Sequence, residues 1–341
     1  MPARLAASFV LSLSLTAALT FVLIHVCKRN GWISKPRVDR WHAGAPACFG
    51  GVAIWLGFVG ASLAVLPRVN LWTFIGATSL MFAVGLIDDT RHLRPGPKLL
   101  AQVGVAAAVV AVCPVFTGGA VNAGWWILWL VGITNAFNLV DNMDGLSSGI
   151  ALIACAALLP AFVVSGEGVM ASVISLLAGA LAGFLMFNFQ PARIFMGDCG
   201  SLFLGCVMGT LSLAPRNDMP GKVAVATIIL AVPIGDMFLV SVTRRLRGQA
   251  ISCGGTDHSS HRLVRLGASE RAAVAMLYGL AAMSGVVGVI AQRLSPAGAI
   301  ATMLLWVTLL TAAGLKLFSY SPHAERAAQP GRRQTETQSA D

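Results

Sequence analysis

Four short polar segments of the chain carry the side chains that could do chemistry. One of them, NAFNLVDNMDGLSSG at 135–149, places Asn135, Asn138, Asp141 and Asp144 at intervals of three residues. Residues three apart lie close together on an α-helix, so each successive pair shares a face while the row drifts around the axis. Carboxylate and amide oxygens in such a row suit a hard cation such as Mg²⁺. The alternative interpretation is a polar helix end with Asx turns.

The second segment, GLIDDTRHLRPGPKLLAQ at 85–102, contains the adjacent aspartates Asp88 and Asp89. Two neighbouring carboxylates near a medium of low dielectric constant repel each other, which raises their pKa values unless a cation or a metal offsets the charge. The segment supplies three cations that could do so: Arg91, Arg94 and Lys98. It predicts either a charge-compensated acidic site or a solvated helix end, because charges are also expected where a helix meets water.

The third segment is FNFQPARIFMGDCGSLFLG at 187–205, in which Gly197 and Gly200 flank Asp198. Glycines allow the backbone to approach a ligand closely, and we expect Ser201 to cap the helix that follows. A helix N-terminus beside a carboxylate and a loop with glycines suits a diphosphate with its metal. The short GDCGS motif is weak evidence alone, but it gains weight from the other acidic segments on the same predicted face.

The fourth segment, GGTDHSSHRLVRLG at 254–267, places His258 and His261 three residues apart and Arg262 directly after them. Two histidines at this spacing could bind zinc, but no glutamate lies between them and no further ligand is evident. Phosphate contact by Arg262 and the histidines is the favoured interpretation. A solvated loop is the alternative.

The elements that position these segments are predicted to be membrane helices. Of the 341 residues, 56% are hydrophobic and 11% are charged, which is far from the composition of soluble domains. A spanning helix needs about 20 apolar residues. Eleven apolar runs approach this length: 5–27, 49–66, 71–87, 99–116, 124–140, 150–164, 169–189, 201–214, 223–242, 272–291 and 297–318. We therefore predict an all-α polytopic membrane protein with about 11 transmembrane helices.

The chain is predicted to form one multi-pass membrane domain over 1–322, followed by a polar, disordered cytoplasmic tail over 323–341. The first run is interpreted as a retained helix, because it is long and Lys28 and Arg29 follow it without a small-residue cleavage pattern. The seven cysteines lack CxxC spacing, which favours a role as buried apolar side chains.

The distribution of basic residues predicts the orientation. Cytoplasmic loops of membrane proteins hold the excess of Lys and Arg. With the N-terminus outside and the C-terminus inside, 19 of the 24 Lys and Arg residues fall on the cytoplasmic side. The net charge of +10 is then concentrated on one face, where it can attract anionic lipid headgroups or phosphorylated substrates. Nucleic acid is disfavoured as a partner, because the chain has no soluble basic domain or basic-aromatic module.

Acidic residues follow the same asymmetry. Of the fourteen, only Glu167 and Asp218 fall in predicted outer loops, while the acidic residues of the four segments lie at predicted cytoplasmic helix ends. Asp236 alone falls inside a run, and an ionisable residue at membrane depth is by default functional or paired. A transporter would more often place carboxylates near the midplane on broken helices. Acidic groups on one rim instead favour an enzyme with one water-soluble and one membrane-held substrate, acting on its cytoplasmic loops.

Together the four segments resemble the polyprenyl-phosphate N-acetylhexosamine-1-phosphate transferases, and specifically the bacterial undecaprenyl-phosphate N-acetylglucosamine-1-phosphate transferase-like branch. The resemblance spans residues 31–271 in motif order. It rests on the paired aspartates with their downstream lysine, on NAFNLVDNMDGL, on GDCGSLFLG and on DHSSHRL. Each motif alone is loose, but four in the family's order on one face of a polytopic membrane protein are specific.

The resemblance implies that a UDP-N-acetylhexosamine, UDP-N-acetylglucosamine first of all, gives its sugar-1-phosphate to undecaprenyl phosphate and releases UMP. The product would start a lipid-linked glycan for the cell wall or a surface polysaccharide. The protein would lie among the lipids of the bacterial inner membrane with its active site facing the cytoplasm, and a homodimer is left open. A muramyl-pentapeptide phosphotransferase is the runner-up, and a lipid or solute transporter is the less favoured alternative.

The resemblance also implies a role for each matching residue. Asn138 and Asp198 would hold Mg²⁺, or alternatively Mn²⁺, against the diphosphate, while Lys98 would neutralise developing charge. Two further pairs would act in catalysis, Asp88 with Asp89 at the lipid phosphate and Asp141 with Asp144 at the nucleotide and metal. The residues assigned to substrate binding are Asn135, Ser201, His258, His261 and Arg262. Little base catalysis is required, because a phosphate monoester with a second pKa near about 6 is already largely dianionic at neutral pH.

Two departures from the family's pattern bear on the identity of the sugar more than on the type of reaction. Cys48 stands near the place where the family often has an arginine shortly before paired glycines. Ser259 and Ser260 stand where many members carry additional histidines.

Overall fold

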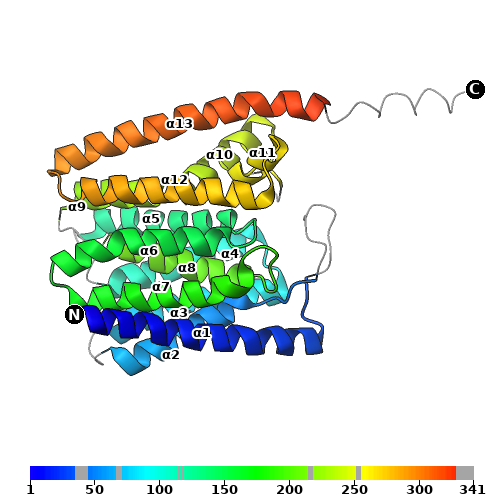
Figure 1. The fold of residues 1–341 in the computed structure, drawn as a ribbon. Helices are drawn as coiled ribbons and strands as arrows, with labels where there is room; N and C mark the ends of the chain where they lie inside the picture. The colour runs from blue at the N-terminus through cyan, green and yellow to red at the C-terminus, as the bar shows by residue number, and fades with distance from the viewer. Residues whose placement is uncertain are drawn as a thin grey trace, which may run out of the picture.

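The computed structural model describes residues 1–34, 45–66, 71–113, 116, 119–213, 218–250 and 255–327. Over these residues the fold is all-α, as predicted, and its only β-type contacts are isolated bridges from Ala47 to Ile33 and to Ile194. Figure 1 shows the helices as a stack of roughly parallel and antiparallel rods. In chain order they are α1 (Pro2–Asn30), α2 (Gly50–Val65), α3 (Leu71–Arg91), α4 (Pro95–Val112), α5 (Gly119–Val140), α6 (Leu146–Val164), α7 (Gly168–Asn188), α8 (Gly197–Leu211), α9 (Met219–Ile229), α10 (Ala231–Leu246), α11 (Ser259–Arg265), α12 (Glu270–Ala291) and α13 (Pro296–Ala327).

Each of the eleven predicted apolar runs corresponds to a helix, except that the ninth is broken in two. Helices α9 and α10 meet at an angle of 78° around Leu230. Pro233 lies in the first turn of α10, where its missing N–H is tolerated. The short helix α11 lies in the long loop between the ninth and tenth runs.

Among the described residues, seven helices are long and apolar enough to cross a membrane, or up to eight if α9 and α10 form one span. The number of eleven transmembrane helices therefore stays a prediction. Two of the remaining apolar helices, α2 and α8, are too short by length alone. Helix α8 carries the third polar segment, so its short length bears on how deep that segment lies in the membrane.

Helix α8 lies in the middle of the stack, and its residues from Cys199 to Leu211 are all buried. Helices α3 and α5 pack along it at very close range. A Cβ on Gly85 of α3 would lie 2.3 Å from the carbonyl oxygen of Asp198, and a Cβ on Gly205 of α8 would lie 2.6 Å from Cα of Thr134. Because these glycines have no side chain, the backbones of α3, α5 and α8 can pack in direct contact.

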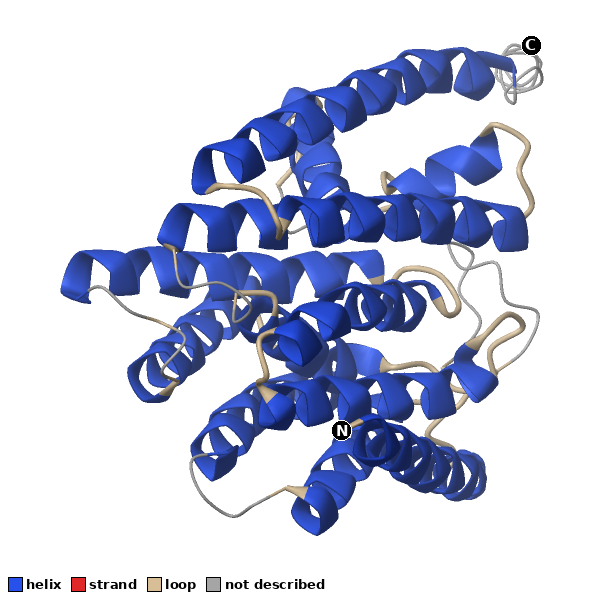
Figure 2. Ribbon diagram, turned by 60° about the vertical axis from the view of Figure 1, so that its left-hand side comes forward, coloured by secondary structure: helices blue, strands red, loops and turns tan. Residues whose placement is uncertain are grey.

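All four polar segments lie at the same end of the helix stack. This end holds the C-terminal ends of α3, α5 and α7, the N-terminal ends of α4, α6, α8 and α12, and α11, as Figure 1 shows. Figure 2 shows the same helical stack turned by 60°. The N-terminus of α1 lies at the opposite end, whereas α13 ends on the side of the polar segments. This arrangement agrees with an odd number of crossings, while the orientation in a membrane stays a prediction.

Some sequence-based predictions concern residues that the structure does not describe. Helix α13 continues to Ala327, past the predicted boundary at residue 322, and the remainder of the predicted tail, 328–341, lies outside the described residues. So do Cys253 and seven of the basic residues counted for the orientation: Lys35, Arg37, Arg40, Arg68, Arg216, Arg332 and Arg333. The other six cysteines are free thiols and five of them are buried, in agreement with the prediction.

Candidate active site

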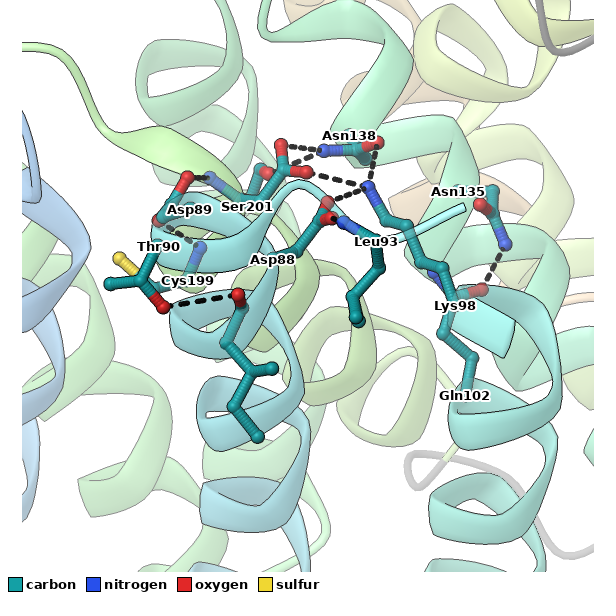
Figure 3. A network of polar contacts seen from close by, with 12 residues as sticks. Asp88, Asp89, Thr90, Leu93, Lys98, Gln102, Asn135, Asn138, Cys199 and Ser201 are labelled. Atoms are coloured by element: carbon teal, nitrogen blue, oxygen red, sulfur yellow. Dashed lines mark hydrogen bonds and ion pairs between the residues drawn. The ribbon is translucent and has the colours of Figure 1, made fainter. Parts of the chain in front are cut away.

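Lys98 is the centre of a polar cluster at the polar end of the helix stack. Its Nζ lies 2.8 Å from Oδ2 of Asp88 and 2.5 Å from Oδ2 of Asp198, and 3.5 Å from Oδ1 of Asn138 (Figure 3). These residues come from α4, α3, α8 and α5, so four helices contribute to one point. One ammonium group thus neutralises part of the charge of two carboxylates, which would otherwise repel each other.

Local sequence explains why Lys98 and Asp88 meet. Helix α4 has Pro95 at its start, which favours a helix N-terminus there, and Lys98 follows within the first turn. Asp88 lies in the last turn of α3, where its Oδ1 accepts a hydrogen bond of 2.7 Å from the backbone N–H of Leu93. The three-residue connection between the helices is therefore fixed by the same carboxylate that contacts Lys98.

Asn138 links α5 to α8. Its Nδ2 donates to Oδ1 of Asp198 at 2.8 Å and to Oγ of Ser201 at 2.9 Å, so its Oδ1 faces Lys98. Ser201 is fully buried and lies in the second turn of α8, because that helix begins at Gly197. The prediction that Ser201 caps this helix is therefore wrong. Its hydroxyl instead orients the amide of Asn138.

The cap of α8 is supplied by Asp89 from α3. Its two carboxylate oxygens accept hydrogen bonds from the backbone N–H groups of Asp198 and Cys199, at 2.8 and 2.9 Å. A carboxylate at this position satisfies N–H groups that a helix leaves without partners and interacts favourably with the helix dipole. Although Asp89 is adjacent to Asp88, it is thus committed to backbone contacts rather than to Lys98.

The glycines of the GDCGS segment serve helix packing in this structure. Gly197 has a positive φ of 75°, and a Cβ there would lie 2.8 Å from Oδ2 of Asp89. A Cβ on Gly200 would lie 2.7 Å from Cα of Gly51 on α2. The predicted close approach is real, but the partner in both cases is another part of the chain.

The row of residues at intervals of three does not remain on one helical face, because α5 ends at Val140. Asn135 donates from Nδ2 to Oε1 of Gln102 on α4, at 2.6 Å. Asp141 lies half-buried in the turn after α5. Asp144 is buried, and its Oδ2 accepts a hydrogen bond of 2.8 Å from the backbone N–H of Ala192, which holds the loop before α8.

The histidine-arginine segment is buried rather than solvated. His258 and His261 are 5% and 6% exposed, with ring centroids 5.9 Å apart. Arg262 is 2% exposed, and its guanidinium donates to the carbonyl oxygen of Asp257 and to Oγ1 of Thr243. The structure thus shows Arg262 in contacts that hold α11 against α10, whereas its predicted phosphate contact stays a prediction.

His261 has a buried ring nitrogen, Nδ1, without a hydrogen-bond partner in the described structure. Burial, together with the nearby His258 and Arg265, lowers the pKa of His261 to about 4, so its ring is neutral at physiological pH. Within the described residues no three His, Cys, Asp or Glu side chains group together as a metal site.

Several side-chain contacts near the candidate site were not anticipated from the sequence. Gln102 lies one turn after Lys98 and pairs with Asn135, while Ser260 donates from Oγ to Oδ1 of Asn142 at 2.5 Å and so ties α11 to the turn after α5. Gln102 could have been noticed from its spacing of four residues from Lys98. Asn142 and Ser260 carry no comparable signal, since their contact joins residues 118 positions apart.

Comparison with known proteins shows the family of this chain. The model of glycosyl transferase family 4 matches residues 71–215, which hold the whole Lys98 cluster. A Bacillus subtilis protein named as a probable undecaprenyl-phosphate N-acetylglucosaminyl 1-phosphate transferase is 31% identical over 291 residues, covering 81% of each chain. The chain belongs to the polyprenyl-phosphate N-acetylhexosamine-1-phosphate transferases. It is therefore a phosphoglycosyl transferase and a multi-pass membrane protein, which removes the transporter alternative.

Two further relatives illustrate the range of the family. A decaprenyl-phosphate N-acetylglucosaminephosphotransferase of Mycobacterium tuberculosis is 30% identical over 299 residues, covering 74% of both chains. A phospho-N-acetylmuramoyl-pentapeptide-transferase of Limosilactobacillus fermentum is 34% identical over 217 residues, covering 56% of this chain and 67% of the relative. The relatives named for N-acetylglucosamine thus align over more of this chain than the muramoyl relative does.

Proposed function

We propose that this transferase moves N-acetylglucosamine-1-phosphate from UDP-N-acetylglucosamine to undecaprenyl phosphate, releases UMP and so starts a lipid-linked glycan. The names of relatives that align over three quarters or more of the chain support the sugar and the polyprenyl acceptor. The reaction would take place on the cytoplasmic face of the bacterial inner membrane, with the UDP-sugar arriving from water and the acceptor from the lipid. A homodimer stays a prediction.

The contact of Lys98 with Asp88 and Asp198 is the observation that carries this proposal. An oxygen of the acceptor phosphate attacks the sugar-bearing phosphorus, the bond from that phosphorus to the bridging oxygen breaks, and UMP leaves. Catalysis of phosphoryl transfer depends mostly on positioning and on neutralising charge. Lys98 supplies a cation for this purpose, while Asp88 holds that cation and the α3–α4 connection in place.

The donor set around Asp198 fits Mg²⁺, with Mn²⁺ as the alternative. Its side chain is 32% exposed, whereas those of Asp88 and Lys98 are 10% and 17% exposed, so Asp198 is the most accessible carboxylate of the cluster. Mg²⁺ commonly takes one or two protein oxygens together with substrate phosphates. Asp198 and Asn138 would hold the ion, which would neutralise charge on the donor diphosphate.

The remaining predicted residues take supporting places in this proposal. Asp141 is the first residue of the turn after α5 and follows Asn138 by three residues, so it can border the nucleotide. Asp89 and Asp144 hold α8 and the loop before it, so they place Asp198 rather than touch substrate. The histidines of α11 are proposed to face the donor, and the buried unpartnered Nδ1 of His261 is the observation that supports this.

A purified, detergent-solubilised enzyme tests the proposal. With Mg²⁺, undecaprenyl phosphate and UDP-N-acetylglucosamine, we expect release of UMP and formation of a lipid-linked sugar, and we expect chelation of the metal by EDTA to stop both. Asp198→Asn, which keeps the side-chain volume, should abolish turnover without changing the elution volume or thermal unfolding. Full activity of that variant would remove Asp198 from the proposed metal site.

The muramoyl-pentapeptide activity is the second candidate, because a relative with that name aligns over 56% of the chain. The same assay distinguishes the two. UDP-N-acetylmuramoyl-pentapeptide offered in place of UDP-N-acetylglucosamine should give no UMP above background, and preferential use of the pentapeptide donor would reverse the assignment. UDP-N-acetylgalactosamine should be included to define the sugar within the N-acetylhexosamines.

A further inference from the structure

Asp236 is a buried carboxylate that no step of the proposed reaction uses. It lies on α10, one turn after Pro233, and is 3% exposed. The helix that carries Asp236, α10, meets α9 at an angle of 78°. A buried charge is costly unless it is paired and hydrogen-bonded, so its partners indicate what it is for.

Within the described residues, the hydrogen bonds of the Asp236 side chain all go to two consecutive residues at the start of α11, its N-cap His258 and its first residue Ser259. Its Oδ2 lies 2.7 Å from Nδ1 of His258, and its Oδ1 accepts hydrogen bonds of 2.7 Å from both the backbone N–H and the hydroxyl of Ser259. The carboxylate therefore does two things at once. It caps the first turn of α11, and it fixes the orientation of one imidazole ring.

The contact also determines which ring nitrogen of His258 carries a proton. An ionised carboxylate can only accept hydrogen bonds, so Nδ1 of His258 must donate. Nε2 is then the ring nitrogen left to contact a substrate. A carboxylate or carbonyl partner at one nitrogen commonly sets the tautomer and direction of a functional histidine in this way.

The same turn of α11 is connected to the active site. Ser260 donates to Asn142, which lies four residues after Asn138 in the turn that follows α5. The ring of His261, with its unpartnered buried Nδ1, lies 5.9 Å from that of His258. A buried polar atom without a protein partner requires an explanation, and a bound substrate group supplies one.

We propose that Asp236 is a positioning residue of this transferase: by accepting a hydrogen bond from Nδ1–H of His258, it presents the histidines at the start of α11 to the nucleotide-sugar donor. This inference rests on the proposed function, because it assumes that α11 faces the donor. The bent pair α9 and α10 would then help to place the donor, in addition to any part it has in crossing the membrane.

The experiment is a double-mutant cycle between Asp236 and His258 in the full-length enzyme. In Asp236→Asn the amide oxygen can still accept from Ser259, but the amide nitrogen now faces Nδ1 and imposes the other tautomer. We expect kcat/KM for UDP-N-acetylglucosamine to fall about 10- to 100-fold, while KM for undecaprenyl phosphate changes less than about twofold. His258→Ala should cause a similar loss, and the double variant should be no worse than His258→Ala within about twofold, because both act through one ring.

Asp218→Asn is the matched control. Asp218 caps α9 at the other end of the same broken span by accepting from the backbone N–H of Gly221, at 2.8 Å. Its substitution removes a capping carboxylate with the same chemistry and should leave donor kinetics unchanged. A loss equal to that of Asp236→Asn would show that the effect reflects the stability of the span, and it would overturn the proposal.

Other outcomes are equally decisive. Losses of Asp236→Asn and His258→Ala that multiply in the double variant would show that Asp236 does not act through His258. If Asp236→Asn does not fold, His258→Ala still tests the proposal, since it leaves Asp236 both Ser259 donors, and full activity of that variant would refute it. Lack of transfer by the wild-type enzyme would instead refute the proposed function, which is a separate result.

Discussion

Asp88 and Asp89 are adjacent in the sequence, yet their carboxylates contact different partners. Asp88 contacts the ammonium of Lys98, whereas Asp89 accepts two backbone N–H groups at the start of α8. Successive side chains on a helix point about 100° apart, so one can reach α4 while the other reaches α8. The two aspartates therefore have separate roles: Asp88 forms an ion pair with Lys98, and Asp89 caps α8.

Neutral substitution of each aspartate separates these roles. Asp88→Asn removes the charge that holds Lys98, and we expect more than about a 100-fold loss of turnover, comparable with the loss of one transition-state contact. Asp89→Asn keeps an acceptor for the α8 backbone, so we expect turnover within about tenfold of wild type and a loss of about 1 kcal/mol of unfolding free energy. UMP release and thermal unfolding measure the two effects. Equal inactivity with unchanged stability in both variants would contradict the capping assignment.

His261 provides a prediction for the dependence of stability on pH. Its pKa is ordinarily 6.5 and is lowered to about 4 in the folded protein, mainly by burial. Between these two values the unfolded chain binds a proton that the folded chain does not, so the free energy of unfolding falls as the pH falls from 6.5 towards 4. Above pH 6.5 the ring is neutral in both states, and its full contribution to the free energy of unfolding is present.

Replacement of His261 by Gln should remove this part of the pH dependence. We expect the thermal unfolding temperature of His261→Gln to fall less steeply between pH 6.5 and pH 5 than that of the wild-type protein, whatever its value at pH 7.5. An unchanged slope in His261→Gln would show that the ring titrates in the same way when folded and unfolded.

At the scale of elements, α1 and α7 show how small residues determine helix packing. A Cβ on Gly179 would lie 2.3 Å from the carbonyl oxygen of Phe9, and one on Gly183 would lie 2.4 Å from that of Leu13. Helix α1 also carries four fully buried small polar residues, Ser8, Ser12, Thr16 and Thr20, of which Thr16 lies against Gly57 of α2. Glycines spaced by four residues allow such close contact between membrane helices, where lipid supplies no hydrophobic driving force between them.

Gly183→Ala should therefore be destabilising although alanine is the better helix former. We expect a loss of about 1–3 kcal/mol from overpacking against the α1 backbone, measured by thermal unfolding in detergent. Gly132→Ala is the matched control, because a Cβ on this α5 glycine meets no atom within 4 Å. It should be neutral or slightly stabilising. Equal stability of both variants would mean that α1 can shift without cost.

The helices were predictable from the sequence because lipid requires long apolar runs, and all eleven runs correspond to helices. The break in the ninth run was not predicted. Pro233 is a signal for such a break, but it was not decisive, because a proline near a helix start is compatible with a continuous span as well as with a bent one. In the site, the convergence of Asp88, Asn138 and Asp198 was predicted from their common face. Which aspartate would contact Lys98 could not be predicted, because it depends on the rotation of α3 against α8.

At the scale of the whole molecule, the four polar segments and the last described turn of α13 lie at one end of the stack, and the N-terminus lies at the other. The connection between α6 and α7 belongs to the end of the N-terminus, since a Cβ on Gly168 would lie 3.7 Å from Cε of Met1. The side of the membrane to which each end belongs stays a prediction from the charge asymmetry, in which 19 of the 24 Lys and Arg residues fall on the predicted cytoplasmic side.

Epitope tags in the full-length protein test this orientation directly. A short tag inserted next to Gly166, in the α6–α7 connection, should be reached by antibody in intact spheroplasts, whereas a tag after Asp341 should be reached only after permeabilisation. Each tagged protein must retain transferase activity, so that the topology measured is that of the working enzyme. The reverse pattern would place the Lys98 cluster outside the cell, away from any supply of nucleotide sugar. Access to both tags from the same side would mean that the chain crosses the membrane an even number of times between them.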